Sequence, residues 1–248
     1  MINFAPALLV AALAGLALGS YAVTAALRYA RAEASARGRS HCDACGQTLG
    51  FAQTVPIVSY FQAGGVCRSC RARIDPLHLA GEVAGLVVLL TAVLVGDVAR
   101  GALMGGLGLA LVWLAAVDWK VGRLPDPLVA VVAMAGLSLS ALNSFEALAA
   151  GLVAAAVAFA IFQGLRLATA RQARGAALGF GDVKLICAMA LWLGALTPWM
   201  VVGAAILGLT FARLSRPAAG RLAFGPMLAL AGWAVGMVAE LGHWPTTV

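Results

Sequence analysis

The sequence predicts an all-α integral membrane protein with about eight transmembrane helices and a small zinc-ribbon-like domain outside the bilayer. Three observations lead to this fold class. Of the 248 residues, 62% are hydrophobic and only 11% are charged, whereas a soluble domain is about a quarter charged. The apolar residues gather in runs that approach the roughly 20 residues a spanning helix needs, and lipid forces spanning backbone to be helical. The one long polar stretch contains two Cys-x-x-Cys pairs.

Eight apolar runs are expected to cross the membrane. The first, residues 4–27, precedes the polar stretch at 28–76. The other seven follow it, at 77–96, 101–117, 127–142, 146–165, 183–196, 198–212 and 222–241. The chain is therefore expected to divide into a first transmembrane helix (1–27), a cysteine-bearing domain (28–76) and a polytopic membrane domain (77–248).

The basic residues predict the orientation of these helices. Every lysine and arginine except Arg100 falls in alternate connecting segments, at 28–76, 118–126, 166–184 and 213–221. Cytoplasmic loops are the ones enriched in basic residues, so we expect these segments inside and the N-terminus outside. The first run has its bases after it and none before it, which favours a retained helix over a cleaved signal peptide. Because topology accounts for the net charge of +7, no nucleic-acid partner is expected.

Two aspartates stand at the ends of apolar runs. Asp118 follows the run 101–117, and Asp182 comes after Gly179-Phe180-Gly181, just before the run 183–196. Glycines allow a tight turn and a close approach of another segment. Ionisable groups near membrane depth are costly and mark functional sites. Two facing carboxyls could share a proton and activate a water molecule. The alternative for Asp182 is a helix N-cap, a position that aspartate favours.

The cysteine pairs predict a metal site. The two pairs are separated by 21 residues and consist of Cys42, Cys45, Cys67 and Cys70. Four thiolates at such spacing form tetrahedral zinc sites, and a site with four protein ligands has no open position, so the zinc would be structural. A reducing cytosol argues against disulfides. Redox-active pairs, or two unrelated pairs of free cysteines, are the alternatives.

The remaining cysteine and the three histidines are interpreted without a catalytic role. His41 adjoins the first pair and is an alternative ligand, although exposure or a hydrogen bond to a thiolate is the commoner use. Cys187 lies within the run 183–196 and is interpreted as a small buried hydrophobe. His78 and His243 stand alone at the ends of segments and are interpreted as interfacial.

In order and spacing, the motifs resemble those of the type IV prepilin peptidases, which are leader peptidases and N-methyltransferases of pilus and type II secretion systems. The resemblance covers nearly the whole chain. It rests on Gly19-Ser20-Tyr21, 40–46, 55–60, 65–70, Glu82, 118–126, the Gly-x-Gly-Asp motif at 179–184, and Phe224-Gly225-Pro226.

The resemblance implies an aspartyl protease of the bacterial inner membrane whose active site faces the cytoplasm. Asp118 and Asp182 would be the catalytic pair, and Asp126 is the rival for the first role. One carboxyl would act as general base on water while the other, protonated, polarises the scissile carbonyl. The substrate would be a prepilin or pseudopilin, cut after a glycine that ends its basic leader. The supporting residues of the motif would be Gly179, Gly181 and Lys184.

The resemblance also implies methylation of the new N-terminus with S-adenosylmethionine, and Gly65 and Glu82 are the residues associated with it. No Gly-rich nucleotide fingerprint is visible. Several departures from the family pattern gather here. Val66 replaces a common lysine, Gln53 and Thr54 replace an acid and an asparagine, and 77–81 lacks the usual Arg-Tyr-Pro.

Two functions of other classes remain as alternatives. A zinc-bearing membrane scaffold of a secretion assembly would need the cysteines and not the aspartates. A proton-coupled transporter would use Asp118, Asp182 and Glu82 as a proton path, but both aspartates are expected on the same side of the membrane.

Overall fold

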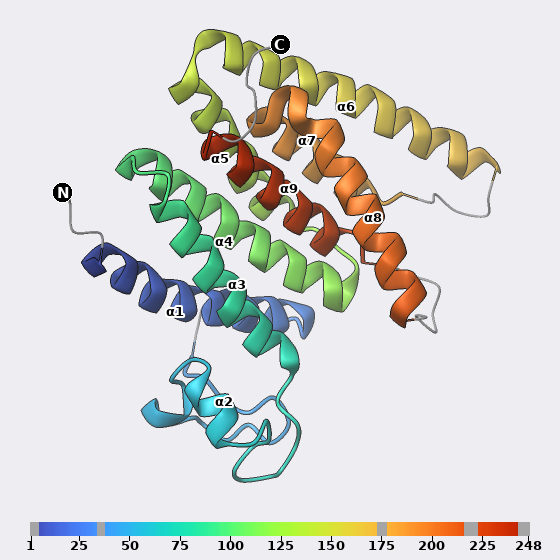
Figure 1. Cartoon of the computed structure of the whole chain (residues 1–248). Coiled ribbons are helices and arrows are strands. Elements are labelled where there is room, and N and C mark those ends of the chain that lie inside the picture. The colour runs from blue at the N-terminus through green and yellow to red at the C-terminus, as the bar shows by residue number, and fades with distance from the viewer. Residues whose placement is uncertain (1–4, 34–37, 173–177, 216–222, 243–248) are drawn as a thin grey trace.

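The computed structural model describes residues 5–33, 38–172, 178–215 and 223–242, and this part of the chain is built of helices without named strands (Figure 1). His243 lies outside the described residues. The elements are α1 (Ala5–Ala30), η1 (Phe51–Gln53), α2 (Val58–Gln62), α3 (Pro76–Val93), α4 (Val98–Val121), α5 (Asp126–Asn143), α6 (Phe145–Gln172), α7 (Phe180–Leu193), η2 (Gly194–Leu196), α8 (Thr197–Ser215) and α9 (Gly225–Glu240). The all-α prediction is confirmed.

Each predicted apolar run corresponds to a helix in this part of the chain, but the last three do not all have spanning length. Six helical stretches are long and apolar enough to cross a bilayer, and one of them is the 36-residue stretch Phe180–Ser215 that joins α7, η2 and α8. The 14 residues of α7 extend only about 21 Å. The chain bends after α7 at Gly194, where φ is +52°, and α8 leads back towards the end of the bundle where α7 begins (Figure 1).

Two helix ends differ from the sequence prediction near the aspartates. The helix α4 continues one turn past the expected end and stops at Gly122, whose φ of +65° is left-handed. The helix α7 begins at Phe180 with Gly179 as its N-cap. The N-cap interpretation of Asp182 is therefore wrong, because Asp182 is the third residue of the helix.

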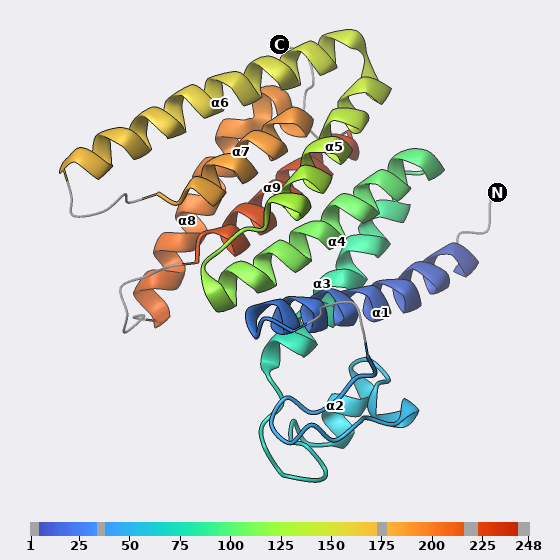
Figure 2. The ribbon, with the colours of Figure 1, turned by 180° about the vertical axis from the view of Figure 1, so that it is seen from behind.

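The helices α1 and α3 pack with their backbones in contact. A Cβ added to Gly19 would lie 2.1 Å from the carbonyl oxygen of Gly81, and one added to Gly85 would lie 2.2 Å from that of Gly15. Small residues allow such close approach of membrane helices. This contact holds α1, which lies apart from α5–α9, against the rest of the bundle (Figure 2).

Replacing Gly85 by alanine is expected to lower the free energy of unfolding by at least about 1–3 kcal/mol, the cost of overpacking a tight contact. The added methyl would meet backbone atoms of Gly15 and Gly19 that cannot move aside cheaply. Thermal unfolding in detergent measures the effect. Gly106→Ala in α4 is the control, because nothing lies within 4 Å of its added Cβ. Equal melting temperatures of the two variants would contradict this packing.

The main core lies between α4, α5, α7 and α9, and α6 covers one side of it (Figures 1 and 2). Fully buried side chains from all four helices meet there, including Leu114, Val132, Met189 and Leu228. A polar cluster closes one end of this bundle. Arg100, the base expected outside, is 2.9 Å from Glu240, and Trp192 donates to the other oxygen of Glu240 at 3.0 Å.

Candidate active site and metal centre

Asp118 is buried at the end of the bundle opposite that polar cluster. It lies in the last turn of α4 with 6% of its surface exposed. Its Oδ2 accepts a hydrogen bond of 2.8 Å from the backbone N–H of Gly225, the first residue of α9. Asp118 of the first aspartate motif (118–126) thus contacts Phe224-Gly225-Pro226, a motif that the sequence only predicted to open the last helix.

Asp182 lies in the first turn of α7, close enough to Asp118 for the two carboxyls to interact electrostatically. Its side chain reaches back to the backbone of Gly179. The same turn of α7 packs directly on the loop after α4, because a Cβ at Gly181 would be 3.2 Å from the Cβ of Leu124. The structure therefore brings the two predicted aspartates together from positions 64 residues apart in the sequence.

Asp126 has different surroundings. Its side chain is 73% exposed and forms an ion pair with Lys184. Lys184 and Arg166 also flank the ring of Phe180, at 5.0 Å and 5.3 Å from its centroid. The ion pair between Asp126 and Lys184 joins the start of α5 to α7. Of the two aspartates in the motif 118–126, Asp118 is the one that interacts with Asp182.

The four cysteines form one cluster, as predicted. Their Sγ atoms all lie within 4.8 Å of one another, and those of Cys42 and Cys70 are 3.8 Å apart. Zn–S bonds of about 2.3 Å in a tetrahedron place the sulfurs about 3.8 Å apart, so the residues present fit a zinc ion. His41 is not in this cluster, and its Nδ1 lies 3.2 Å from the carbonyl oxygen of Arg39.

Two similar turns present the sulfurs. In the first turn, the N–H of Cys42 donates to Gln47 and the N–H of Gly46 donates back to Cys42. In the second turn, Cys67 and Ala72 are bonded in the same way, and Arg71 donates back to Cys67. The backbone N–H groups of Cys70 and Ser69 lower the pKa of the Cys67 thiol to about 6, which favours the thiolate that binds metal.

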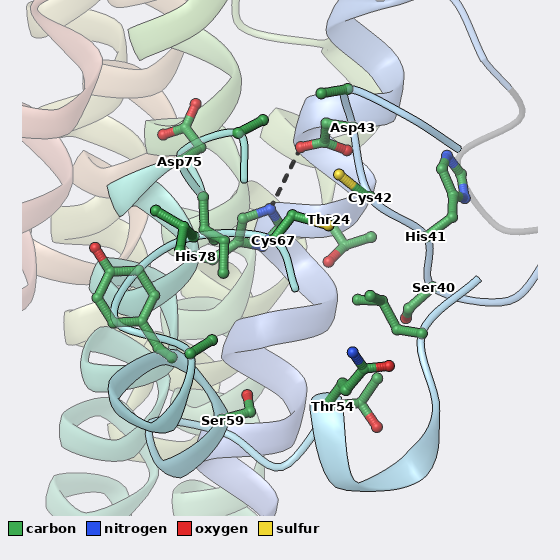
Figure 3. A pocket seen from close by; sticks show the side chains of 18 of the residues that line it. Thr24, Ser40, His41, Cys42, Asp43, Thr54, Ser59, Cys67, Asp75 and His78 are labelled. Atoms are coloured by element: carbon green, nitrogen blue, oxygen red, sulfur yellow. Dashed lines mark ion pairs between the residues drawn. The ribbon is translucent and has the colours of Figure 1, made fainter. Parts of the chain in front are cut away.

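Ion pairs connect the cysteine domain to the helices, and sequence reasoning missed them. Asp43, inside the first Cys-x-x-Cys, is 3.0 Å from Arg31. It is also 3.6 Å from Nε2 of His78 in α3 (Figure 3). The hydrogen bond to His78 holds the pKa of the Asp43 carboxyl below its ordinary value. His78, which was expected to stand alone at the end of its segment, therefore has a partner. The position of Asp43 between Cys42 and Cys45 was a signal for a contact of this kind, but nothing in the sequence identified Arg31 or His78 as its partners.

The cysteine domain and the aspartate pair lie at the same end of the molecule. Asp75 caps α3 by accepting from the N–H of Leu77 and also pairs with Lys120. Lys120 lies two residues beyond Asp118 in the last turn of α4. The start of α3 and the end of α4 are thus held together next to the cysteine domain.

A cavity of about 320 Å³ lies between the cysteine domain and the helices α1 and α3 (Figure 3). Glu82 of α3 lines it and is 7% exposed. Its two oxygens accept from Ser20 Oγ at 2.9 Å and from the N–H of Ile57 at 2.6 Å. Val66 lines the cavity, whereas its neighbour Gly65 lies outside the lining and packs on the ring of Tyr60.

This cavity fits a small polar cofactor. Its volume is in the range of small-molecule sites. Its lining combines carboxylates, four arginines and hydroxyl groups, among them Asp43, Asp75, Glu82, Arg28, Arg31, Arg68, Arg73, Ser20, Thr24 and Tyr60. S-adenosylmethionine carries two positive groups, a carboxylate and ribose hydroxyls, so this donor and acceptor set is chemically suited to it.

The fold and the site define a polytopic α-helical membrane protein with two interacting aspartates and a cluster of four cysteines that could hold a metal ion. Two family models match the chain, the bacterial peptidase A24 N-terminal domain over residues 13–95 and the type IV leader peptidase family over residues 106–213. The chain belongs to the type IV leader peptidase family.

Several curated proteins are similar to the chain. The prepilin leader peptidase/N-methyltransferase of Burkholderia pseudomallei (strain K96243) is 33% identical over 206 residues, which cover 78% of this chain and 65% of that protein. The protein of the same name from Dichelobacter nodosus is 30% identical over 211 residues, covering 78% and 69%. The type 4 prepilin-like proteins leader peptide-processing enzyme of Escherichia coli O78:H11 is 32% identical over 199 residues, covering 78% and 73%. No solved structure matches the chain.

Proposed function

We propose that the protein is an aspartyl endopeptidase that removes the leader from type IV prepilins or type II secretion pseudopilins. The observation that carries the proposal is the proximity of Asp118 and Asp182, two carboxyls from separate helices. The names of the similar proteins support the substrate class. The chain spans 65% of the length of the Burkholderia pseudomallei relative. Both aspartates lie within residues 106–213, the part that matches the type IV leader peptidase family.

The pair performs acid–base chemistry on a water molecule. Two neighbouring carboxyls cannot both ionise cheaply, so they share one proton and titrate together. The ionised member takes a proton from the water, which attacks the scissile carbonyl carbon. The protonated member donates a hydrogen bond to the carbonyl oxygen and stabilises the charge that develops there. The proton from the water then passes to the leaving amine, and the shared proton is restored.

The reaction takes place at the cytoplasmic face of the bacterial inner membrane in this proposal. The positive-inside rule puts the basic segments there, and it places the N-terminus outside. Asp118, Asp182 and the cysteine domain share one end of the molecule through the Asp75–Lys120 pair. A prepilin with its apolar helix in the membrane would present its leader peptide bond at this depth. Zinc held by the four cysteines has a structural role, fixing the domain that covers the start of α3.

Co-expression with a prepilin in a strain without its own prepilin peptidase tests the activity. We expect the pilin to lose its leader only when the chain is present, as a shift on a denaturing gel. An unchanged precursor across several prepilins and pseudopilins would contradict the proposal, and the scaffold and transport alternatives would then become stronger.

The second activity that we propose is methylation of the new N-terminal amine, with S-adenosylmethionine bound in the cavity beside the cysteine domain. Glu82 holds α1, α3 and the segment at Ile57 together at this cavity. The residues of the chain would bind and orient the cofactor, which supplies the methyl group. Val66 stands in the lining at the position where the family resemblance implies a lysine, so this chain would hold the cofactor without a lysine there.

Replacing Glu82 by glutamine is expected to lower the methylated fraction of processed pilin by about tenfold or more while cleavage stays within about twofold of wild type. The variant weakens two charge-assisted hydrogen bonds, each worth about 1.5–3 kcal/mol, and these lie at the cavity and not at the aspartates. Mass spectrometry of the pilin N-terminus reads both activities at once. Glu146→Gln is the control, because Glu146 is exposed in the first turn of α6 and does not line the cavity. Equal methylation by the two variants would contradict the placement of the cofactor.

A further inference from the structure

The first turn of α9 has one backbone donor that the helix itself does not use. The helix begins at Gly225, and Pro226 follows without an N–H group. The next two N–H groups, of Met227 and Leu228, both donate to the carbonyl oxygen of Phe224, at 3.1 Å and 3.0 Å. The remaining donor, the N–H of Gly225, is bonded to Oδ2 of Asp118 at 2.8 Å.

This hydrogen bond requires glycine. A Cβ at position 225 would lie 2.8 Å from Oδ2 of Asp118 and 3.0 Å from its Cγ. Contacts this short do not occur between a Cβ and a carboxyl group, so any other residue would push the Asp118 side chain or the start of α9 away. Glycine is thus the residue type that lets the backbone N–H approach the buried carboxyl.

A hydrogen-bond donor stabilises the carboxylate of Asp118 more than that of Asp182, because the two side chains lie at opposite ends of their helices. Asp118 lies in the last turn of α4, where the negative end of the helix dipole disfavours a carboxylate. Asp182 lies in the first turn of α7, where the positive end favours one. The N-terminus of α9 brings a positive helix end to Asp118, the member of the pair that its own helix does not support.

We propose that the N-terminus of α9, through the N–H of Gly225, is a positioning element that holds the carboxyl of Asp118 towards Asp182. Its catalytic consequence rests on the proposed peptidase function, whereas the hydrogen bond itself does not. The motif Phe224-Gly225-Pro226 thereby acquires a function. The proline removes a competing donor, and the glycine presents the remaining donor to the active-site carboxyl.

Hydrogen exchange of the protein in detergent tests the hydrogen bond without reference to activity. In Asp118→Ala, one amide in the peptide that contains Gly225 is expected to exchange about tenfold faster than in wild type, because it loses its acceptor. Asp182→Ala is the control and is expected to leave that amide unchanged. Unaltered exchange in Asp118→Ala, or equal acceleration in both variants, would overturn the proposal.

Kinetics test the positioning role. Gly225→Ala is expected to lower kcat for prepilin cleavage by about 100-fold, the scale of a displacement of about 1 Å at a reacting group, with KM within about twofold. Gly203→Ala in α8 is the matched control, because its Cβ would meet Ala231 at an ordinary 3.4 Å. A kcat equal to that of Gly203→Ala would overturn the proposal. If wild type fails to cleave prepilin, the peptidase function fails instead, and the exchange experiment still decides the hydrogen bond.

Discussion

Replacing either Asp118 or Asp182 by asparagine is expected to lower the rate of prepilin cleavage by at least about 10³-fold, within the range by which general acid–base catalysis accelerates reactions. Asparagine keeps the size of the side chain but cannot take a proton from water or carry the shared proton. The N–H of Gly225 can still donate to the amide oxygen at position 118, so the fold around the pair is expected to survive. Initial rates of leader release, measured on equal amounts of purified enzyme, give the effect.

Asp126→Asn is the matched control for this prediction. It changes the rival aspartate of the same motif, whose side chain is exposed and paired with Lys184. An exposed ion pair is worth at most about 1 kcal/mol, so the cleavage rate is expected to stay within about fivefold of wild type. Loss of cleavage in Asp126→Asn with retained cleavage in Asp118→Asn would reverse the assignment of the catalytic residue.

Replacing Cys67 by serine is expected to abolish metal binding and to unfold the cysteine domain. The domain has little core of its own, and among its described residues the two turns that carry the sulfurs are joined at the cluster. Zinc binding to such small domains is worth on the order of 10 kcal/mol at neutral pH, far more than the ion pairs that tether the domain could supply. The membrane helices pack independently of the cluster, so the bundle is expected to remain.

Metal content and limited proteolysis measure this loss together. Wild type is expected to hold one zinc per chain and to resist trypsin at Arg68, Arg71 and Arg73. Cys67→Ser is expected to hold none and to be cut there. Cys187→Ser, which changes the half-buried cysteine of α7, is expected to retain both zinc and resistance. Full protection of Cys67→Ser against trypsin would show that the domain folds without metal.

The sequence was enough to predict the helices, the cysteine cluster and the two aspartates, because each has a local signal. Apolar runs are visible in composition, and the spacing of the cysteines reflects the turn that each pair must make. The aspartates stand out because acids beside apolar runs are costly. Most helix ends were displaced by a few residues. The shift of α7 from Asp182 to Phe180 mattered most, because it changed Asp182 from a cap into a residue of the first turn.

The parts that could not be predicted are contacts between distant segments. Nothing in the residues around Gly225 indicates that its N–H meets Asp118, 107 positions away. The partner of Asp43 and the closure of the cavity by Glu82 and Ile57 likewise depend on how α1 and α3 cross. Their crossing is fixed by Gly15, Gly19, Gly81 and Gly85. Glycine in a membrane helix can serve for contact or merely be tolerated, and only the packed helices distinguish the two.

The most direct test of the central claim is the intact mass of a prepilin after incubation with the purified chain in lipid nanodiscs, beside the Asp182→Asn variant. Wild type is expected to remove the whole leader, with the cut directly after its last glycine, and the variant is expected to leave the precursor at full mass. Cleavage by Asp182→Asn at the wild-type rate, or an intact precursor with active-site residues unchanged, would contradict the account that Asp118 and Asp182 form the catalytic centre.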